Sequence, residues 1–137
     1  AGAGAAVGIV ALPNASGVAV VLCALFAGTR LVISWFPMDA PGADPTVTGR
    51  RHGQLAMSAF VSVGIAAATL SRVLRDHHAD GSLAGPSGAL AAVMLVALVA
   101  MALDRRAGGG HFGLAERCFY AAMTAWLVVV AVLVATA

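Results

Sequence analysis

The side chains best suited to chemistry gather in one short stretch of the chain, ISWFPMDAPGADPTVTGRRHGQLAM (33–57). It contains two aspartates, two arginines and one histidine, punctuated by three prolines, and it joins two long apolar segments. Carboxylate, guanidinium and imidazole groups can bind ions, exchange protons or hold polar head groups. A specific site is therefore expected where this stretch meets its apolar flanks.

Further charged residues approach the same boundary. Arg30 lies about two helical turns before Pro37, inside the apolar zone, where an unpaired charge is costly. We predict that a polar cluster orders the loop over the mouth of the bundle, formed by Arg30, Asp39, His52, Glu116 and Arg117. The alternative is a set of ordinary membrane-edge charges solvated by lipid head groups.

The four histidines of the chain raise the question of a metal or haem. His52 and His111 fall on the same side of the predicted bundle and are the candidates for haem ligation. Haem ligands usually lie within facing helices, however, whereas His111 follows three glycines. A zinc site needs three or four ligands at constrained spacing, which HHAD (77–80) does not supply. We therefore expect neither a cofactor nor a metal.

Signatures of catalysis are absent from the sequence. It has no serine nucleophile elbow, no phosphate-binding glycine loop, no HExxH and no paired acidic residues in its apolar segments. Its arginines are too sparse for a nucleic-acid surface. We expect a non-enzymatic protein that does not bind nucleic acid.

The elements that must position these residues are membrane-spanning helices. Hydrophobic residues make up 61% of the chain, charged residues 10%, and the mean hydropathy is +0.94. Spanning the hydrocarbon core takes about 20 apolar residues, and a spanning segment must satisfy its own backbone hydrogen bonds. The sequence thus predicts one all-α integral membrane helical bundle (1–137), with helices near 14–36, 53–74, 83–103 and 114–136.

The first dozen residues, AGAGAAVGIVAL, are equally apolar but too short to cross a bilayer. Pro13 and Asn14 indicate a turn after them. The segment lacks the basic leading region of a signal peptide, and its alanine and glycine content suits helix packing. We interpret residues 1–12 as the remnant of a further helix from a longer protein.

The arginines indicate an orientation. Six of the eight lie in or beside the loops 37–52 and 104–113, against two at the other face, and the chain has no lysine. Cytoplasmic loops carry an excess of positive residues. We therefore expect both loops to be cytoplasmic.

Small residues spaced four apart predict where the helices pack, because membrane helices approach closely only where side chains are short. Such positions are Ser58, Ser62 and Ala66 in the second span, Gly88 and Ala92 in the third, and Ala121 and Ala125 in the fourth. Trp126 lies deep enough in its span to pack inside the bundle rather than at the membrane interface.

Three short motifs carry a resemblance to a known family. An apolar helix ends in FPMD, GRRHG leads into a helix of small residues, and GLAER opens the last helix. From about residue 18 onward, the chain resembles bacterial multi-spanning membrane proteins known as domain of unknown function 998. The motif positions of that family fall on Phe36, Pro37, Asp39, Gly49, His52, Gly113, Leu114 and Arg117. The resemblance implies a multi-spanning helical fold, usually of six spans, in a bacterial inner (cytoplasmic) membrane, and no assigned activity.

Two classes of function fit these observations. The first is an accessory or structural subunit that packs beside a larger membrane complex, which is consistent with the apolar composition and the absence of catalytic motifs in the sequence. The second is a small transporter or a lipid- or quinone-binding protein, in which the predicted polar cluster lines a cavity. A haem-linked redox role is a third. Copurification with a partner would favour the first class, a cavity the second, and a visible absorption spectrum the third.

Overall fold

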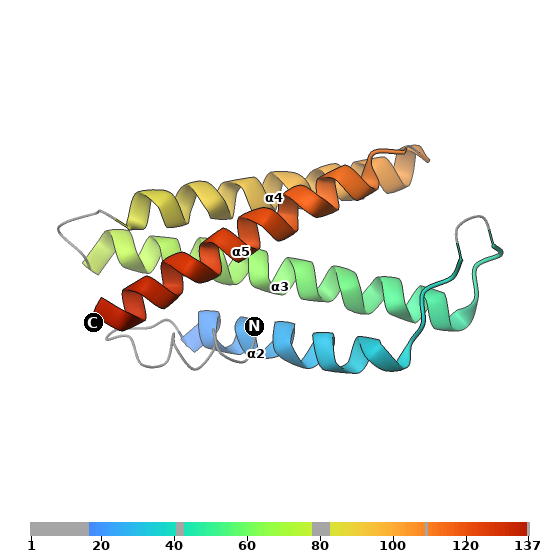
Figure 1. The fold of residues 1–137 in the computed structure, drawn as a ribbon, viewed down its shortest axis with the longest axis horizontal. Helices are drawn as coiled ribbons and strands as arrows, with labels where there is room; N and C mark the ends of the chain where they lie inside the picture. Colours follow the sequence, from blue (N-terminus) through green and yellow to red (C-terminus); the bar gives the residue numbers. More distant parts are fainter. Residues whose placement is uncertain (1–16, 41–42, 78–82, 109, 137) are drawn as a thin grey trace.

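The protein folds as a bundle of long helices, shown in Figure 1. The computed structural model describes residues 17–40, 43–77, 83–108 and 110–136. In that part of the chain there is no strand. The elements are α2 (Gly17–Val32), the short 3-10 helix η1 (Ile33–Trp35), α3 (Val47–His77), α4 (Ala84–Ala107) and α5 (Phe112–Thr136).

Among the residues that the structure describes, four helical segments are long and apolar enough to cross a membrane: Gly17–Trp35, Val47–Asp76, Ala84–Ala107 and Phe112–Val132. The predicted all-α bundle of four spanning helices is thereby confirmed. The interpretation of residues 1–12 as a partial helix concerns a segment outside the described residues. The observed helices differ from the predicted ones mainly at their ends, since α3 begins at Val47 and α4 continues to Ala107.

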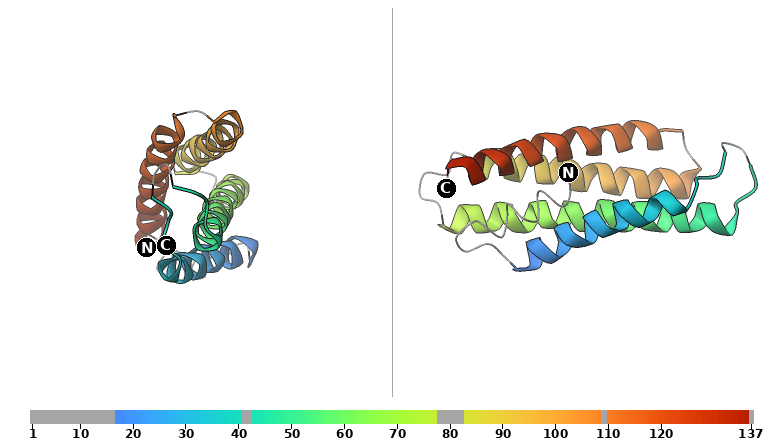
Figure 2. Two further views of the ribbon diagram at one scale, coloured as in Figure 1. Left: turned by 90° about the vertical axis from the view of Figure 1, so that its right-hand side faces the viewer. Right: turned by 60° about the horizontal axis from the view of Figure 1, so that its bottom comes forward.

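Helices that follow one another in the chain pack side by side, α2 on α3, α3 on α4 and α4 on α5 (Figure 2). In Figure 1, α5 also passes across α3 at an angle, and the two helices are in contact. The α2–α3 connection and the α4–α5 connection lie at the same end of the bundle, the right-hand end of Figure 1. We call this end the mouth. It is where the charged loops meet.

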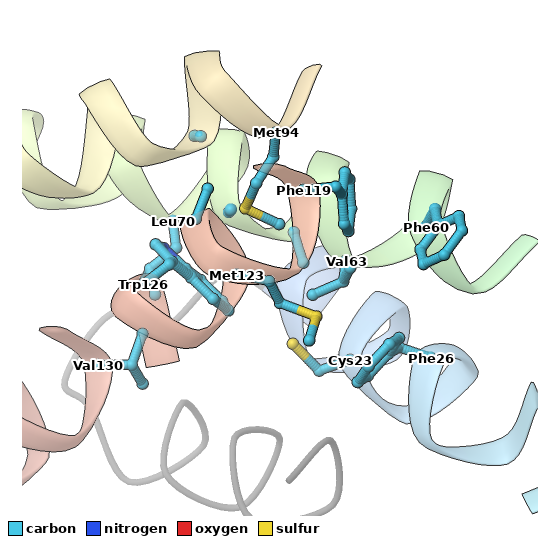
Figure 3. Close-up of a cluster of buried hydrophobic side chains, with 14 of the residues drawn as sticks. Cys23, Phe26, Phe60, Val63, Leu70, Met94, Phe119, Met123, Trp126 and Val130 are labelled. Atoms are coloured by element: carbon cyan, nitrogen blue, oxygen red, sulfur yellow. The ribbon is translucent and has the colours of Figure 1, made fainter. Parts of the chain in front are cut away.

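Large apolar side chains fill the interior of the bundle, between the helices (Figure 3). Trp126, Phe119 and Met94 are fully buried, and Phe60 is nearly so. The rings of Phe60 and Phe119 are tilted with centroids 4.9 Å apart, a favourable aromatic arrangement. The expectation that Trp126 packs inside the bundle is confirmed.

The predicted packing positions are displaced by one residue in two of the helices. Ser87 and Ala91 are buried in α4, whereas Ala92 is exposed. In α5 Ala122 is buried, whereas Ala121 and Ala125 are exposed. The buried face of α5 carries the bulky residues Phe119, Met123 and Trp126. The buried face of α4 consists mainly of small residues beside Met94 and Met101, so close approach of small side chains still brings α4 to its neighbours.

Candidate functional site

Asp39 holds the loop of the mouth against the first turn of α3. Its Oδ1 accepts a hydrogen bond from the Thr46 hydroxyl at 2.6 Å, and its Oδ2 accepts one from the Thr46 backbone N–H at 3.1 Å. The Thr46 Oγ1 in turn accepts from the Gly49 N–H at 3.0 Å. Thr46 is thus the N-cap of α3, and Asp39 plays the reciprocal part that an acidic residue inside the helix plays in a capping box. The cap begins the helix at Val47, earlier than apolarity alone predicts.

Gly49 is required by this arrangement. A Cβ at position 49 would collide with the Asp39 carboxylate. The glycine therefore lets the loop carboxylate lie against the helix, where the N-terminal end of the helix dipole also favours a negative charge.

His52 ties the first residue of the loop to α3. Its Nδ1 lies 2.7 Å from the Phe36 carbonyl oxygen, which can only accept a hydrogen bond. We therefore assign the proton to Nδ1, which leaves Nε2 without a partner among the described residues. The Arg51 guanidinium carbon also lies 5.8 Å from the centroid of the Phe36 ring, within cation–π range. Hydrogen bonds thus join the FPMD and GRRHG motifs. We call the residues Phe36, Asp39, Thr46 and His52, which attach the loop to α3, the clasp.

A pocket of about 370 Å³ opens beside this clasp, and we call it the mouth pocket. Four segments contribute to it: the loop after η1, the first turns of α3, the end of α4 and the start of α5. Its lining residues are Met38, Asp39, Gly49, His52, Gly53, Ala56, Met57, Phe60, Arg105, Phe112 and Glu116. Charged groups and apolar side chains thus line a single cavity where the spans end.

Arg105 and Glu116 bring opposite charges to the mouth pocket without neutralising each other. Among the described residues neither makes an ion pair, and Glu116 makes no hydrogen bond. The guanidinium of Arg105 lies 5.8 Å from the Phe112 ring centroid, and one of its nitrogens would lie 3.4 Å from a Cβ placed at Gly53. Arg105 therefore lies close to α3 at Gly53, at a distance where a Cβ would make an ordinary van der Waals contact.

The predicted polar cluster is only partly brought together. Asp39, His52 and Glu116 line the mouth pocket, but Arg30 and Arg117 do not. Arg30 is exposed and reaches the Tyr120 hydroxyl at 3.4 Å, beyond the usual range of a hydrogen bond. Arg117 is exposed next to Glu116. Neither arginine forms an ion pair among the described residues, so Arg30 lacks the carboxylate partner expected for it.

Arg105 was not among the predicted site residues. The predicted span ended at residue 103, which left Arg105 in a solvated loop, but α4 continues to Ala107. The helix ends at Gly108, whose left-handed conformation (φ 63°) favours glycine. The signal was present in the sequence, because GGG (108–110) follows the arginines as a helix C-cap.

His111, the other histidine considered for haem, has different interaction partners from His52. Its backbone N–H donates to the Asp104 Oδ1 at 3.3 Å, and its exposed ring Nδ1 lies 3.7 Å from the same oxygen. The other carboxylate oxygen of Asp104 is buried without a hydrogen bond. Within the described ranges no three His, Cys, Asp or Glu side chains are grouped to hold a metal ion. Residues 78–80 of the HHAD segment lie outside those ranges.

A second polar group, not anticipated from the sequence, is buried away from the mouth. The Trp126 Nε1–H donates to the Ser87 Oγ at 3.2 Å, and the hydroxyls of Ser87 and Ser71 are 2.7 Å apart. Since the Ser71 hydroxyl donates to the Ala67 carbonyl, Ser87 must donate to Ser71. This chain of hydrogen bonds joins α3, α4 and α5 and fully satisfies its members.

The fold and the mouth pocket define a multi-pass integral membrane protein of the all-α class. Residues 1–133 match the family described as Protein of unknown function (DUF998), and the chain belongs to that family. The resemblance carried by the FPMD, GRRHG and GLAER motifs is confirmed. No curated protein and no solved structure matches the chain.

Proposed function

We propose that this protein binds an amphiphilic small molecule, a lipid or a quinone, in the mouth pocket, and that this role is non-enzymatic. The observation that carries the proposal is the composition of the pocket: unpaired charged groups face apolar side chains within one cavity. An amphiphile satisfies both kinds of lining at once.

The size and the position of the pocket support this role. Its volume, about 370 Å³, lies within the usual range of small-molecule sites, about 300–1,000 Å³. It lies where the spanning helices end, which is the depth of the lipid head groups. A lipid or a quinone could therefore enter from the bilayer without leaving the membrane.

The clasp supports the proposal further. It fixes the loop and the first turns of α3 through hydrogen bonds within the protein. A site that is ordered before binding loses less conformational entropy when the ligand arrives. The clasp thus prepares one wall of the pocket.

Filling the pocket tests the proposal. The full chain is purified in detergent, and bound lipids and quinones are quantified by mass spectrometry. Ala56→Phe places a ring in the pocket and should reduce the bound amphiphile at least fivefold. Ala102→Phe, an equal change on an exposed position of α4 outside the pocket, is the matched control. If both variants retain as much as the parent protein, the proposal is overturned.

A second candidate is an accessory subunit that packs against a larger membrane complex. A groove of about 450 Å³ between α2 and α3 favours it, because Gln54 and Ser58 lie exposed in its lining. In hydrocarbon such side chains seek a hydrogen-bond partner on another helix. We propose a spanning helix of a partner protein as the occupant. Gln54→Leu with Ser58→Ala should abolish copurification of that partner from native membranes, while Ala102→Phe should not.

We further propose that the mouth faces the cytoplasm of a bacterial cell, in the inner membrane. The excess of arginine in the loops at the mouth supports this orientation. A cysteine introduced at Gly110, in a Cys23→Ala, Cys118→Ala background, should resist a membrane-impermeant thiol reagent in whole cells and react in inverted vesicles. Labelling in whole cells would reverse the orientation.

A further inference from the structure

We propose that the ligand of the mouth pocket is zwitterionic, with a phosphate that binds Arg105 and a primary ammonium that binds Glu116. This is the chemistry of an ethanolamine phosphate group, found in a phosphatidylethanolamine head group and in free phosphoethanolamine. The inference rests on the proposed function and specifies its ligand.

Arg105 provides the site for the anionic half. Its planar guanidinium offers paired N–H donors that match two oxygens of a phosphate, and its charge persists at any physiological pH. It makes no hydrogen bond or ion pair with another described residue, so its donors are available. The contact with the Phe112 ring holds its guanidinium in the lining of the pocket.

Glu116 provides the site for the cationic half. Its carboxylate can only accept hydrogen bonds when ionised, and it accepts none from the described residues. A half-buried carboxylate without a partner is stabilised by a cation that donates hydrogen bonds. A primary ammonium has three N–H donors, whereas the quaternary ammonium of choline has none.

The balance of charge in the pocket disfavours a purely anionic ligand. Two carboxylates, Asp39 and Glu116, face a single guanidinium. The Asp39 carboxylate already accepts hydrogen bonds from Thr46 and lies at the start of α3. It therefore stabilises the wall of the pocket and does not bind the ligand. A phosphate without an ammonium would pair with Arg105 but leave Glu116 beside an added negative charge.

An uncharged ligand is disfavoured as well. A quinone could accept a hydrogen bond from Arg105 but would leave the Glu116 carboxylate unpaired within the pocket. The apolar lining of Ala56, Met57 and Phe60 suits the glycerol backbone and the first methylenes of a lipid. Because the volume is near the lower end of the range for small-molecule sites, the pocket holds the head of the lipid while its chains remain in the bilayer.

Competition between lipids tests the inference. The full chain in detergent micelles is exposed to equal amounts of phosphatidylethanolamine, phosphatidylcholine and phosphatidylglycerol with identical acyl chains, and bound lipid is measured by native mass spectrometry. The parent protein should retain phosphatidylethanolamine at least fivefold over each of the others. Glu116→Gln should bring the three lipids to within about twofold, since it removes the charge that selects the ammonium. Arg105→Gln should lower retention of all three.

Matched controls separate the pocket from general surface charge. Arg106 and Arg117 adjoin Arg105 and Glu116 in sequence, are exposed and do not line the pocket. Arg106→Gln and Arg117→Gln should keep the parent preference. Thermal unfolding of each variant verifies that it is folded.

The outcomes distinguish this inference from the proposed function. If phosphatidylglycerol or phosphatidylcholine binds as well as phosphatidylethanolamine, or if Glu116→Gln keeps the preference, the inference is overturned. The proposed function still stands in that case, provided that Ala56→Phe lowers lipid retention. If retention is insensitive to Ala56→Phe, the proposed function itself fails.

A further arm identifies the source of the head group. Free phosphoethanolamine is added at millimolar concentration to the protein loaded with phosphatidylethanolamine. Displacement of the selectively bound lipid supports the shared chemistry and assigns the water-soluble compound as a ligand in its own right. Selective retention without displacement supports it with the membrane lipid as the ligand.

Discussion

Single residues at the mouth explain why a polar loop interrupts so apolar a chain. Asp39 caps α3 through Thr46, and His52 binds the Phe36 carbonyl, so the start of the loop is attached at two points to the helix that follows it. These bonds place the loop as one wall of the mouth pocket rather than as a free linker. Two substitutions at this scale test the clasp.

Gly49→Ala should destabilise the protein by about 1–2 kcal/mol, the size of a lost helix cap, because the added Cβ displaces the Asp39 carboxylate. Thermal unfolding in detergent measures the effect. Gly113→Ala is the control, since nothing lies within 4 Å of a Cβ at that helical position. It should be neutral or stabilising by up to about 1 kcal/mol. Equal stability of the two variants would contradict the close contact between Gly49 and Asp39.

Thr46→Val should cost about 1 kcal/mol in unfolding free energy, because it removes the hydroxyl that caps α3 and binds Asp39. Thr48→Val is matched in chemistry, and the Thr48 side chain makes no hydrogen bond with the described residues. Chemical denaturation in micelles compares the two. A larger loss for Thr48→Val would show that the cap is misassigned.

At the scale of elements, the helices are joined by side-chain hydrogen bonds as well as by apolar packing. Ser87 lies at the centre of a buried chain that links the Trp126 indole of α5 to Ser71 of α3. Helices in lipid gain no hydrophobic driving force from packing against one another, so such bonds help to specify which faces meet. This network accounts for the displaced packing stripe of α4.

Ser87→Ala should lower the unfolding free energy by about 1–3 kcal/mol, because it leaves the Trp126 N–H unpaired in the interior. Trp126→Phe removes that donor, so the double variant should be less destabilised than the sum of the single variants. Thermal unfolding in detergent completes this double-mutant cycle. Strict additivity would show that the two side chains do not interact.

At the scale of the whole molecule, α3 is the central helix, since α2 and α4 pack on it and α5 passes across it in contact (Figure 1). The outer surfaces of the other helices expose large apolar residues, as suits contact with acyl chains. The depth of a residue along the span should therefore decide how well a charge is tolerated on this surface.

Val96→Arg should impair membrane insertion by about 2.5–3.5 kcal/mol, because Val96 is exposed near the middle of α4. Leu103→Arg, also on an exposed position but near the end of the helix, should be tolerated, because the side chain can extend to the head groups. An insertion assay in isolated membranes compares the two variants. Equal insertion would contradict the depth assigned to α4.

The sequence by itself determined that four helices cross a membrane and that polar groups gather at one end of them. Both follow from local properties, namely the length of apolar runs and the cost of burying unpaired charge, and neither depends on how the helices meet. It also predicted one polar cluster that includes Asp39, His52 and Glu116, and these three residues line the mouth pocket.

Only the tertiary structure decided which charged residues share the mouth pocket. Arg105 lines it and Arg30 does not, because α4 extends to Ala107 and the Arg105 guanidinium lies over the Phe112 ring. The sequence has small residues on adjacent stripes of the same helix, so spacing alone could not choose the inward face. That choice depends on the burial of Phe119 and Trp126 and on the hydrogen bond to Ser87, which exist only once the helices are side by side.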